Sequence, residues 1–133
     1  MTDRAPETGL QSQFGPLEYA ILDVLWTTAP LDVGDCVQRL EGGHAYTTIK
    51  TVMERLVKKG YLRRERQARS YLYWPVGSRQ EVLEAVARRR SDELLAGFGP
   101  LAVTHFLRSV GSDTSRLNQL KTLLAEIEAG DQR

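Results

Sequence analysis

The residues best suited to chemistry in this chain are eight cationic side chains between Thr47 and Ser70, where only two carboxylates accompany them. They are Lys50, Arg55, Lys58, Lys59, Arg63, Arg64, Arg66 and Arg69, against Glu54 and Glu65. The segment therefore carries a net charge of +6, although the whole chain of 133 residues carries only +1. Ammonium and guanidinium groups at this density are suited to neutralising the phosphates of a nucleic acid.

The first part of this segment has the pattern of an amphipathic helix. The helix is expected to begin near Thr47, where a threonine can cap it, and to end at Gly60. The positions predicted to be buried are Ile49, Val52, Met53 and Leu56. The opposite face carries Thr47, Thr48, Lys50, Thr51, Glu54, Arg55 and Lys58. Hydroxyl and ammonium groups on such a face can meet base edges and phosphates.

Two shorter helices are predicted ahead of this one. The first follows Gly15-Pro16, and the second is capped by Asp32 and followed by a turn with two glycines. A helix, a glycine-containing turn and a polar helix form a helix-turn-helix, whose last helix enters the major groove of DNA. A solvated helix beside a solvated hairpin is the alternative interpretation, and the combination of helix order and positive charge favours DNA binding.

Two strands are predicted next, at residues 61–66 and 70–76, joined by a short connection. This hairpin would form the wing of a winged helix and place Arg69 near the DNA backbone or minor groove.

Beyond residue 77 the sequence predicts helices alone. Ser78 and Glu81 form a capping box, Gly99-Pro100 opens a second helix that carries Phe106, and Asp113 caps a third. An apolar seam on the last helix consists of Leu117, Leu120, Leu124 and Ile127. This seam would pack either within the chain or against a second copy, and Phe106 is grouped with it as a candidate dimerisation residue.

The predicted fold class is therefore mainly α with a small β-hairpin. We expect a flexible tail at residues 1–13, a winged-helix DNA-binding domain at 14–77 and a helical dimerisation domain at 78–133. The tail is expected to be loose because its residues are mostly polar.

Enzymatic and metal chemistry find little support in the sequence. Cys36, His44 and His105 share no metal-ligand spacing, and no glycine-rich loop is present to cradle a phosphate. We therefore expect neither catalysis nor a cofactor. The single cysteine excludes an internal disulfide, and no apolar leader or membrane span is evident, so a cytoplasmic protein is expected.

Three stretches of the sequence carry a resemblance to a known family. They are FGPLEYAILDVLW, AYTTIKTVMERLVKKGYLRRER and RSYLYWPV. They closely resemble the penicillinase-repressor family of winged-helix regulators, which includes the β-lactamase and methicillin-resistance repressors. The resemblance extends over roughly residues 14–127.

The resemblance implies a homodimer bound to an inverted-repeat operator, with dimerisation through the C-terminal helices. It also implies that Arg69 lies at the wing tip and that a membrane sensor-protease pathway relieves repression by cleaving the C-terminal domain. The staphylococcal members are cut at an Asn-Phe bond, and the matching bond here is His105-Phe106. The residues that match the groove-facing start of the family's recognition helix are Tyr46, Thr47, Thr48, Lys50 and Thr51.

Two other functions remain open at this stage. One is a ligand-sensing winged-helix regulator with an effector pocket between the domains, which would need polar groups converging in an apolar cleft. The other is a winged-helix protein-interaction module that does not bind DNA, and such a module should lack a basic recognition face.

Overall fold

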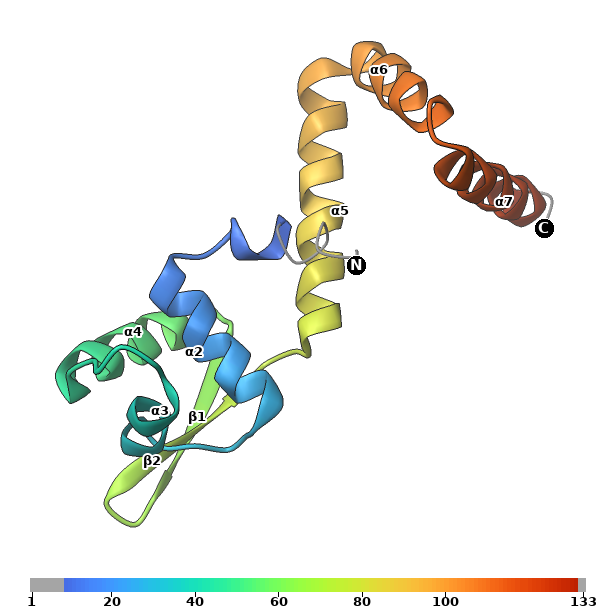
Figure 1. Ribbon diagram of the computed structural model, residues 1–133. Coiled ribbons are helices and arrows are strands. Elements are labelled where there is room, and N and C mark those ends of the chain that lie inside the picture. The colour runs from blue at the N-terminus through green and yellow to red at the C-terminus, as the bar shows by residue number, and fades with distance from the viewer. Residues whose placement is uncertain (1–8, 132–133) are drawn as a thin grey trace. The chain divides into compact units, whose positions relative to one another are not determined.

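The computed structural model describes residues 9–131 and confirms the predicted fold class (Figure 1). The N-terminal elements are α2 (Pro16–Thr27), α3 (Val33–Arg39), α4 (Tyr46–Lys58), β1 (Leu62–Gln67) and β2 (Ser70–Pro75). The C-terminal helices are α5 (Arg79–Phe98), α6 (Pro100–Gly111) and α7 (Thr114–Asp131). The chain forms two compact units that divide between Ala87 and Arg88, inside α5. The predicted domain limit at Gly77 marks a change in composition, and the N-terminal unit extends past it.

Short polar residues begin three of these helices, α3, α5 and α7, as the sequence predicts. Asp32 accepts a hydrogen bond from the Asp35 N–H at 2.8 Å and so caps α3. Ser78 and Glu81 exchange hydrogen bonds of 2.9 and 3.0 Å in the predicted capping box. The Arg116 N–H donates to Asp113 Oδ1 at 3.1 Å ahead of α7.

The predicted threonine cap of α4 is wrong. This helix begins at Tyr46 with Ala45 as its N-cap, and no side chain caps it. Thr47 already lies inside the first turn, where its carbonyl accepts a hydrogen bond from Thr51 Oγ1 at 2.9 Å. The first N–H groups of α4 are therefore without a side-chain acceptor.

The core of the N-terminal unit lies between the three helices and the hairpin. Its fully buried large side chains include Ile21, Leu22, Leu25, Ile49, Met53, Leu56, Leu62 and Tyr73. The four positions of α4 that were predicted to face inward are all buried. Val86 of α5 belongs to the same core. The apolar stripe at helical spacing thus turns the remaining residues of α4 toward solvent.

Residues 9–13 differ from the flexible tail expected there. Leu10 is 0% exposed and packs in the core, and the Gln13 N–H donates to the Leu10 carbonyl at 3.0 Å. The sequence gives little indication that Leu10 is buried, because a single leucine among polar neighbours forms no periodic apolar pattern. Residues 1–8 of the expected tail lie outside the described residues.

The hairpin is antiparallel, and its register runs from Leu62 opposite Pro75 to Gln67 opposite Ser70. A two-residue loop joins the strands, and Ala68 in this loop has a φ of 53°. The base of the hairpin is attached to the core by Leu31 and Tyr73, whose backbones exchange hydrogen bonds of 2.9 and 3.3 Å. The tip projects away from the helices of its unit (Figure 1).

The start of α5 is fastened to α2 by polar contacts. Trp26 Nε1 donates to the Gly77 carbonyl at 3.0 Å. Arg79 donates to the Tyr19 hydroxyl at 3.0 Å and also forms an ion pair with Asp23. These contacts join segments more than fifty residues apart, so they fix the first turn of α5 against α2.

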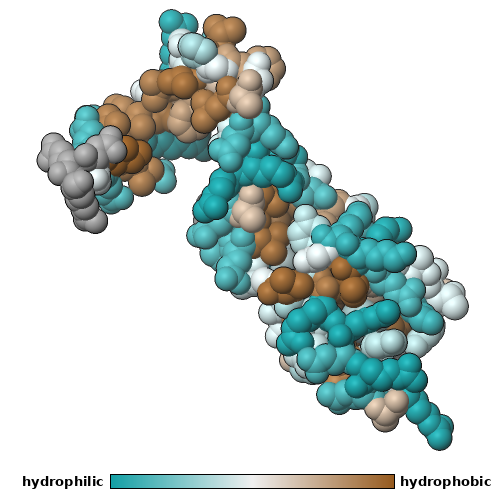
Figure 2. Space-filling model, turned by 180° about the vertical axis from the view of Figure 1, so that it is seen from behind, coloured by the Kyte–Doolittle hydropathy of each residue, from teal (hydrophilic) through white to brown (hydrophobic). Residues whose placement is uncertain are grey.

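The C-terminal unit has almost no core of its own. Beyond Ala87, the only buried positions of the described chain are Ala102 and Val110. Large apolar side chains lie exposed along all three helices, and Figure 2 shows them as brown surface on this part of the molecule. An apolar surface of this kind is typical of a face that another molecule covers.

Candidate nucleic-acid interface

The outward face of α4 carries the predicted residues in exposed positions, except Glu54, which is half-buried. The exposed side chains on it are Tyr46, Thr47, Thr48, Lys50, Thr51, Arg55 and Lys58. Tyr46 is 54% exposed, which is unusual for a large aromatic side chain beside a well-packed core. Since no side chain caps the helix, its first N–H groups and the exposed hydroxyls of Thr47 and Thr48 are donors suited to phosphate and base edges.

Ion pairs divide the eight cations of the basic segment into two equal sets. The paired set is Arg55, Lys59, Arg63 and Arg64. Among the described side chains, no ion pair involves the other four, which are Lys50, Lys58, Arg66 and Arg69. A cation without an intramolecular carboxylate keeps its full charge for a phosphate, so the second set is the better candidate for DNA contact.

Glu18 accounts for two of the paired cations. Its Oε2 lies 3.1 Å from Arg55 Nε and 2.9 Å from Lys59 Nζ, and its side chain is 7% exposed. Its other oxygen accepts a hydrogen bond from the Gly15 N–H at 3.0 Å. Burial by itself would raise the pKa of Glu18, but the hydrogen bonds from Lys59, Gly15 and Arg55 outweigh it and hold the pKa below its ordinary value.

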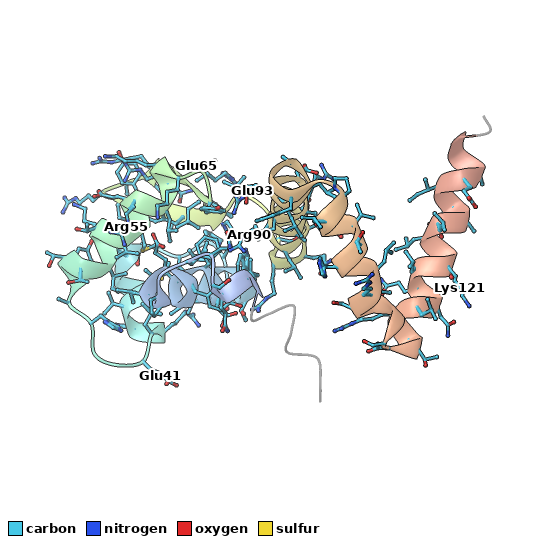
Figure 3. All side chains as sticks on the ribbon, turned by 90° about the horizontal axis from the view of Figure 1, so that it is seen from above. Glu41, Arg55, Glu65, Arg90, Glu93 and Lys121 are labelled. Atoms are coloured by element: carbon cyan, nitrogen blue, oxygen red, sulfur yellow. The ribbon has the colours of Figure 1, made fainter. Side chains whose placement is uncertain are left out.

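Arg55 therefore lies at the flank of α4 that faces α2 (Figure 3, where Arg55 is labelled). Its side chain remains half exposed, but its charge is already balanced inside the protein. Lys58 lies on the same helix without such a partner among the described residues, so the two cations predicted there have different surroundings.

The aromatic strand of the hairpin supports the arginines of the basic strand. The guanidinium of Arg63 lies 4.4 Å from the ring centroid of Trp74, and that of Arg64 lies 4.1 Å from the ring of Tyr71. Arg66 lies 5.4 Å from the same tyrosine ring. Cation–π contacts of this kind hold flexible arginines in place without neutralising their charge.

A recess of about 340 Å³ lies between α4, the hairpin and the start of α3. Its lining residues are Asp32, Val33, Gly34, Tyr46, Lys50, Glu54, Arg66, Arg69, Ser70, Tyr71 and Tyr73. Three of the four unpaired cations meet here, because α4 contributes Lys50 and the hairpin contributes Arg66 and Arg69. The structure thus brings two separately predicted parts of the site together.

Arg66 was missing from the predicted site residues. The signal that could have identified it is the alternation of β1, because Leu62, Arg64 and Arg66 share one face of the strand. Leu62 is 2% exposed, so this face turns toward α4. Arg63 and Glu65 occupy the other face and pair with each other at 3.0 Å.

The described residues give no support for a metal site, a reactive thiol or a membrane span. No group of three metal-ligating side chains lies together within residues 9–131. Cys36 is 0% exposed, and burial raises the pKa of its thiol to about 11, so it is unreactive. In the same residues, no helix combines the length and apolar character that a bilayer crossing requires.

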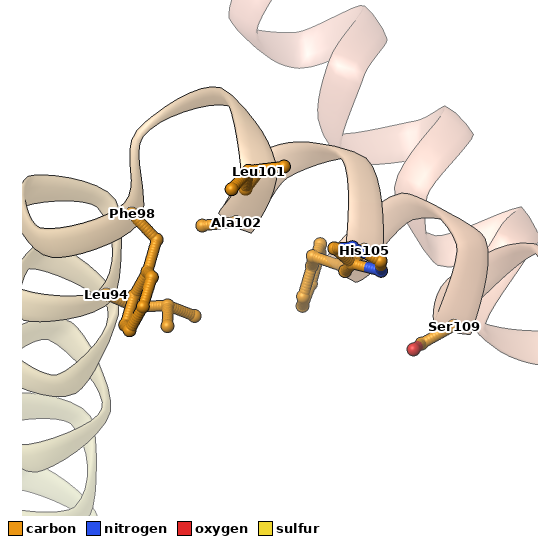
Figure 4. Close-up of a pocket in the computed structure, with 7 residues that line it drawn as sticks. Leu94, Phe98, Leu101, Ala102, His105 and Ser109 are labelled. Carbon is orange, nitrogen blue, oxygen red and sulfur yellow. The ribbon is translucent and has the colours of Figure 1, made fainter.

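The predicted dimerisation residues lie on the C-terminal helices and are largely exposed. The exposed fractions are 58% for Phe106, 49% for Leu124 and 61% for Ile127. Leu117 and Leu120 are half-buried. An apolar groove of about 450 Å³ between α5 and α6 is lined by Leu94, Phe98, Leu101, Ala102, His105, Phe106 and Ser109 (Figure 4). The candidate cleavage bond, His105-Phe106, lies inside α6 at the edge of this groove.

The chain is similar in sequence to known transcriptional regulators over most of its length. The family model described as "Penicillinase repressor" matches residues 14–126. The chain is 34% identical over 125 residues to "Transcriptional regulator BlaI" of Mycobacterium tuberculosis, covering 90% of this chain and 88% of the relative. It is 22% identical over 116 residues to "Penicillinase repressor" of Bacillus licheniformis, covering 86% and 91%. The solution structure of the DNA binding domain of the repressor BlaI matches 52% of this chain and 87% of its own, at 24% identity and a TM-score of 0.47.

Proposed function

The chain belongs to the penicillinase repressor family of transcriptional repressors, and we propose that it acts as a homodimer bound to an inverted-repeat operator. The observation that carries the DNA-binding part of this proposal is that Lys50, Arg66 and Arg69 line one recess beside the outward face of α4. A helix face rich in hydroxyls can read base edges while the cations around it hold the backbone. Occupying a promoter in this way denies it to the transcription machinery.

Within this proposal, the residues of α4 have different roles. Base edges in the major groove are met by the exposed start of the helix, at Thr47, Thr48 and Lys50. Tyr46 and Thr51 flank them and contact sugar or phosphate. Phosphates are held by Lys58, Arg66 and Arg69, whereas Arg55 supports the fold through Glu18 and adds little to binding.

The proposed dimer forms through the C-terminal helices. Burying one large apolar side chain contributes about 1.5–3 kcal/mol, so leaving many exposed in one unit forgoes considerable stability. A second copy of the same face would cover them symmetrically, since a two-fold interface uses the same residues on both partners. The seam of α7 together with Phe106 supplies the centre of that interface.

Relief of repression is proposed to follow cleavage at His105-Phe106. Both side chains are exposed, but the bond lies within a helix, so α6 must unwind locally before a protease can accept it. Cutting there would separate α7 from α5 and remove the dimer interface. Two half-sites that were bound together would then be bound independently and more weakly.

Selection of genomic DNA fragments by the purified full chain tests the proposal. We expect recovered fragments to share an inverted repeat with half-sites about one helical turn apart. With four cations in the basic segment of each chain unpaired among the described residues, a dimer neutralises about eight phosphates, so log K should fall with log salt at a slope near −7. A slope shallower than about −2, or fragments without a common repeat, would overturn the proposal.

A further inference from the structure

Arg64 differs from the other arginines of the hairpin in its surroundings. Its side chain is 30% exposed, whereas that of Arg63 next to it is 52% exposed. Its Nη1 lies 3.2 Å from the Tyr73 hydroxyl and 3.5 Å from Glu54 Oε2. Its guanidinium also stacks on the ring of Tyr71. One side chain of β1 therefore contacts both β2 and α4.

Tyr73 holds the Arg64 guanidinium against the core of the N-terminal unit. It is 1% exposed, its backbone is bonded in both directions to Leu31, and it lies directly opposite Arg64 in the register of the hairpin. A hydroxyl held in this way cannot move without disturbing the core. The guanidinium of Arg64 is thus attached to the core at one side and reaches α4 at the other.

Glu54 is the partner of Arg64 on α4, and the presence of a carboxylate at this position needs an explanation. It lies on α4 and lines the same recess as Lys50, Arg66 and Arg69. A carboxylate at a surface that receives phosphates weakens binding by repulsion unless it has another role. Its partner here is Arg64, which is the one paired cation of the segment that joins α4 to the hairpin.

We propose that Arg64 is a positioning residue that fixes the hairpin against α4 through Glu54 and Tyr73, so that the cations of both elements meet one DNA backbone together. The inference rests on the proposed DNA-binding function and adds a role for two residues that do not contact DNA. The geometry favours it because Arg66 and Arg69 reach the recess from the hairpin, whereas Lys50 reaches it from α4. Without the link, each element would meet the backbone separately and would lose the advantage of a preformed surface.

Arg64→Met tests the role of the guanidinium, with Arg63→Met as its matched control. Both changes remove one positive charge from neighbouring positions of β1, but Arg63 pairs with Glu65 on the opposite face. We expect Arg64→Met to weaken binding to the selected operator about tenfold, as expected for loss of charge-assisted hydrogen bonds. Arg63→Met should change binding by less than about threefold, as expected for an exposed pair. Equal losses for the two variants would overturn the inference.

The dependence of binding on salt separates positioning from phosphate contact. If Arg64 does not touch DNA, Arg64→Met leaves the slope of log K against log salt unchanged. Arg66→Met, which removes an unpaired cation, should make the slope shallower by about 1 for each half-site. The inference is wrong if Arg64→Met shifts the slope as much as Arg66→Met does.

Glu54→Gln gives a result whose sign decides between two explanations. Simple electrostatics predicts tighter DNA binding, because a negative charge is removed beside the phosphates. Loss of the link to Arg64 predicts weaker binding instead, by about threefold or more, and the double variant with Arg64→Met should bind no more weakly than Arg64→Met alone. Tighter or unaltered binding by Glu54→Gln would overturn the proposal.

Tyr73→Phe keeps the test valid if Arg64→Met fails to fold. This change retains the buried ring and removes only the hydroxyl that holds Arg64, so it should weaken operator binding in the same direction. Wild-type binding to the selected operator is measured in every experiment. Its absence would refute the proposed function, whereas normal wild-type binding with unaffected variants would refute the role of Arg64 alone.

Discussion

Arg55 of α4 pairs with Glu18 of α2 across 3.1 Å, although the two residues are 37 positions apart in the chain. Lys59 joins the same carboxylate one helical turn later. This contact connects the first turn of α2 with the last turn of α4, and it withdraws two cations from the proposed DNA-binding surface. The basic segment is therefore less available to phosphate than its charge of +6 indicates.

Glu18→Gln should reduce the free energy of unfolding by about 1–3 kcal/mol near pH 7, nearer the lower value because Arg55 and Lys59 are half exposed. The folded-state pKa of Glu18 lies below 4.5, so its contribution is fully present above that pH. It is lost as the pH falls through the lower, folded-state pKa. Urea unfolding of both proteins from about pH 7 downward checks this, and a difference that does not shrink as the pH falls below 4.5 would contradict it.

Lys58→Ala and Arg55→Ala should separate DNA binding from stability on one helix. Lys58 has no ion-pair partner among the described residues, so its loss should make the salt dependence of operator binding shallower and leave the melting temperature unchanged. Arg55→Ala should lower the melting temperature, because it deprives Glu18 of a partner, and should affect the salt dependence less. Binding titrations and thermal unfolding measure both quantities, and identical behaviour of the two variants would contradict the assignment.

Thr48→Ala and Lys50→Ala should each reduce discrimination between the operator and a scrambled sequence by about 1–3 kcal/mol, because each removes a side chain that is proposed to meet a base edge. Both side chains are exposed and off the buried face of α4, so circular dichroism and melting should barely change. Competition binding with the two DNAs measures the effect. An equal reduction in affinity for both would identify these residues as backbone contacts.

Ala68→Gly should stabilise the hairpin by about 0.5–1 kcal/mol. Ala68 has a positive φ of 53°, which costs an alanine about 1–2 kcal/mol and a glycine almost nothing, while the greater freedom of an unfolded glycine offsets part of the gain. The control is Ala85→Gly in α5, at an exposed helical position, where the same change should destabilise the protein by about 1 kcal/mol. Chemical unfolding compares them, and destabilisation by both would contradict the expected strain at the hairpin tip.

The double variant Phe106→Ala and Ile127→Ala should dissociate the proposed dimer while leaving each chain folded. Both side chains are about 60% exposed within one chain, so their truncation costs little intramolecular packing. Lys121→Ala, at an exposed polar position of α7, is the control and should remain dimeric. Sedimentation at micromolar concentration distinguishes these outcomes. A double variant that stays dimeric would place the interface elsewhere.

The sequence by itself determined the helices, the hairpin and the outward face of α4. Local patterns specify these features, because an apolar stripe at helical spacing, a capping side chain and strand alternation each act over a few residues. The apolar seam of α7 was read from the same kind of pattern, whereas the exposure of Phe106 is seen only in the structure. Even so, the N-cap of α4 was mispredicted, and so was the burial of Leu10, which depends on packing against residues distant in the sequence.

Only the tertiary structure decided which cations have no carboxylate partner among the described residues and so remain available for the proposed DNA contact. Glu18 is far from Arg55 and Lys59 in sequence, and the link from Glu54 to Arg64 crosses from a helix to a strand. Counting charges along the chain gives all eight cations equal weight, since composition contains no through-space distances. Coulombic and hydrogen-bonding interactions depend on those distances, which exist only once α2, α4 and the hairpin have packed around one core.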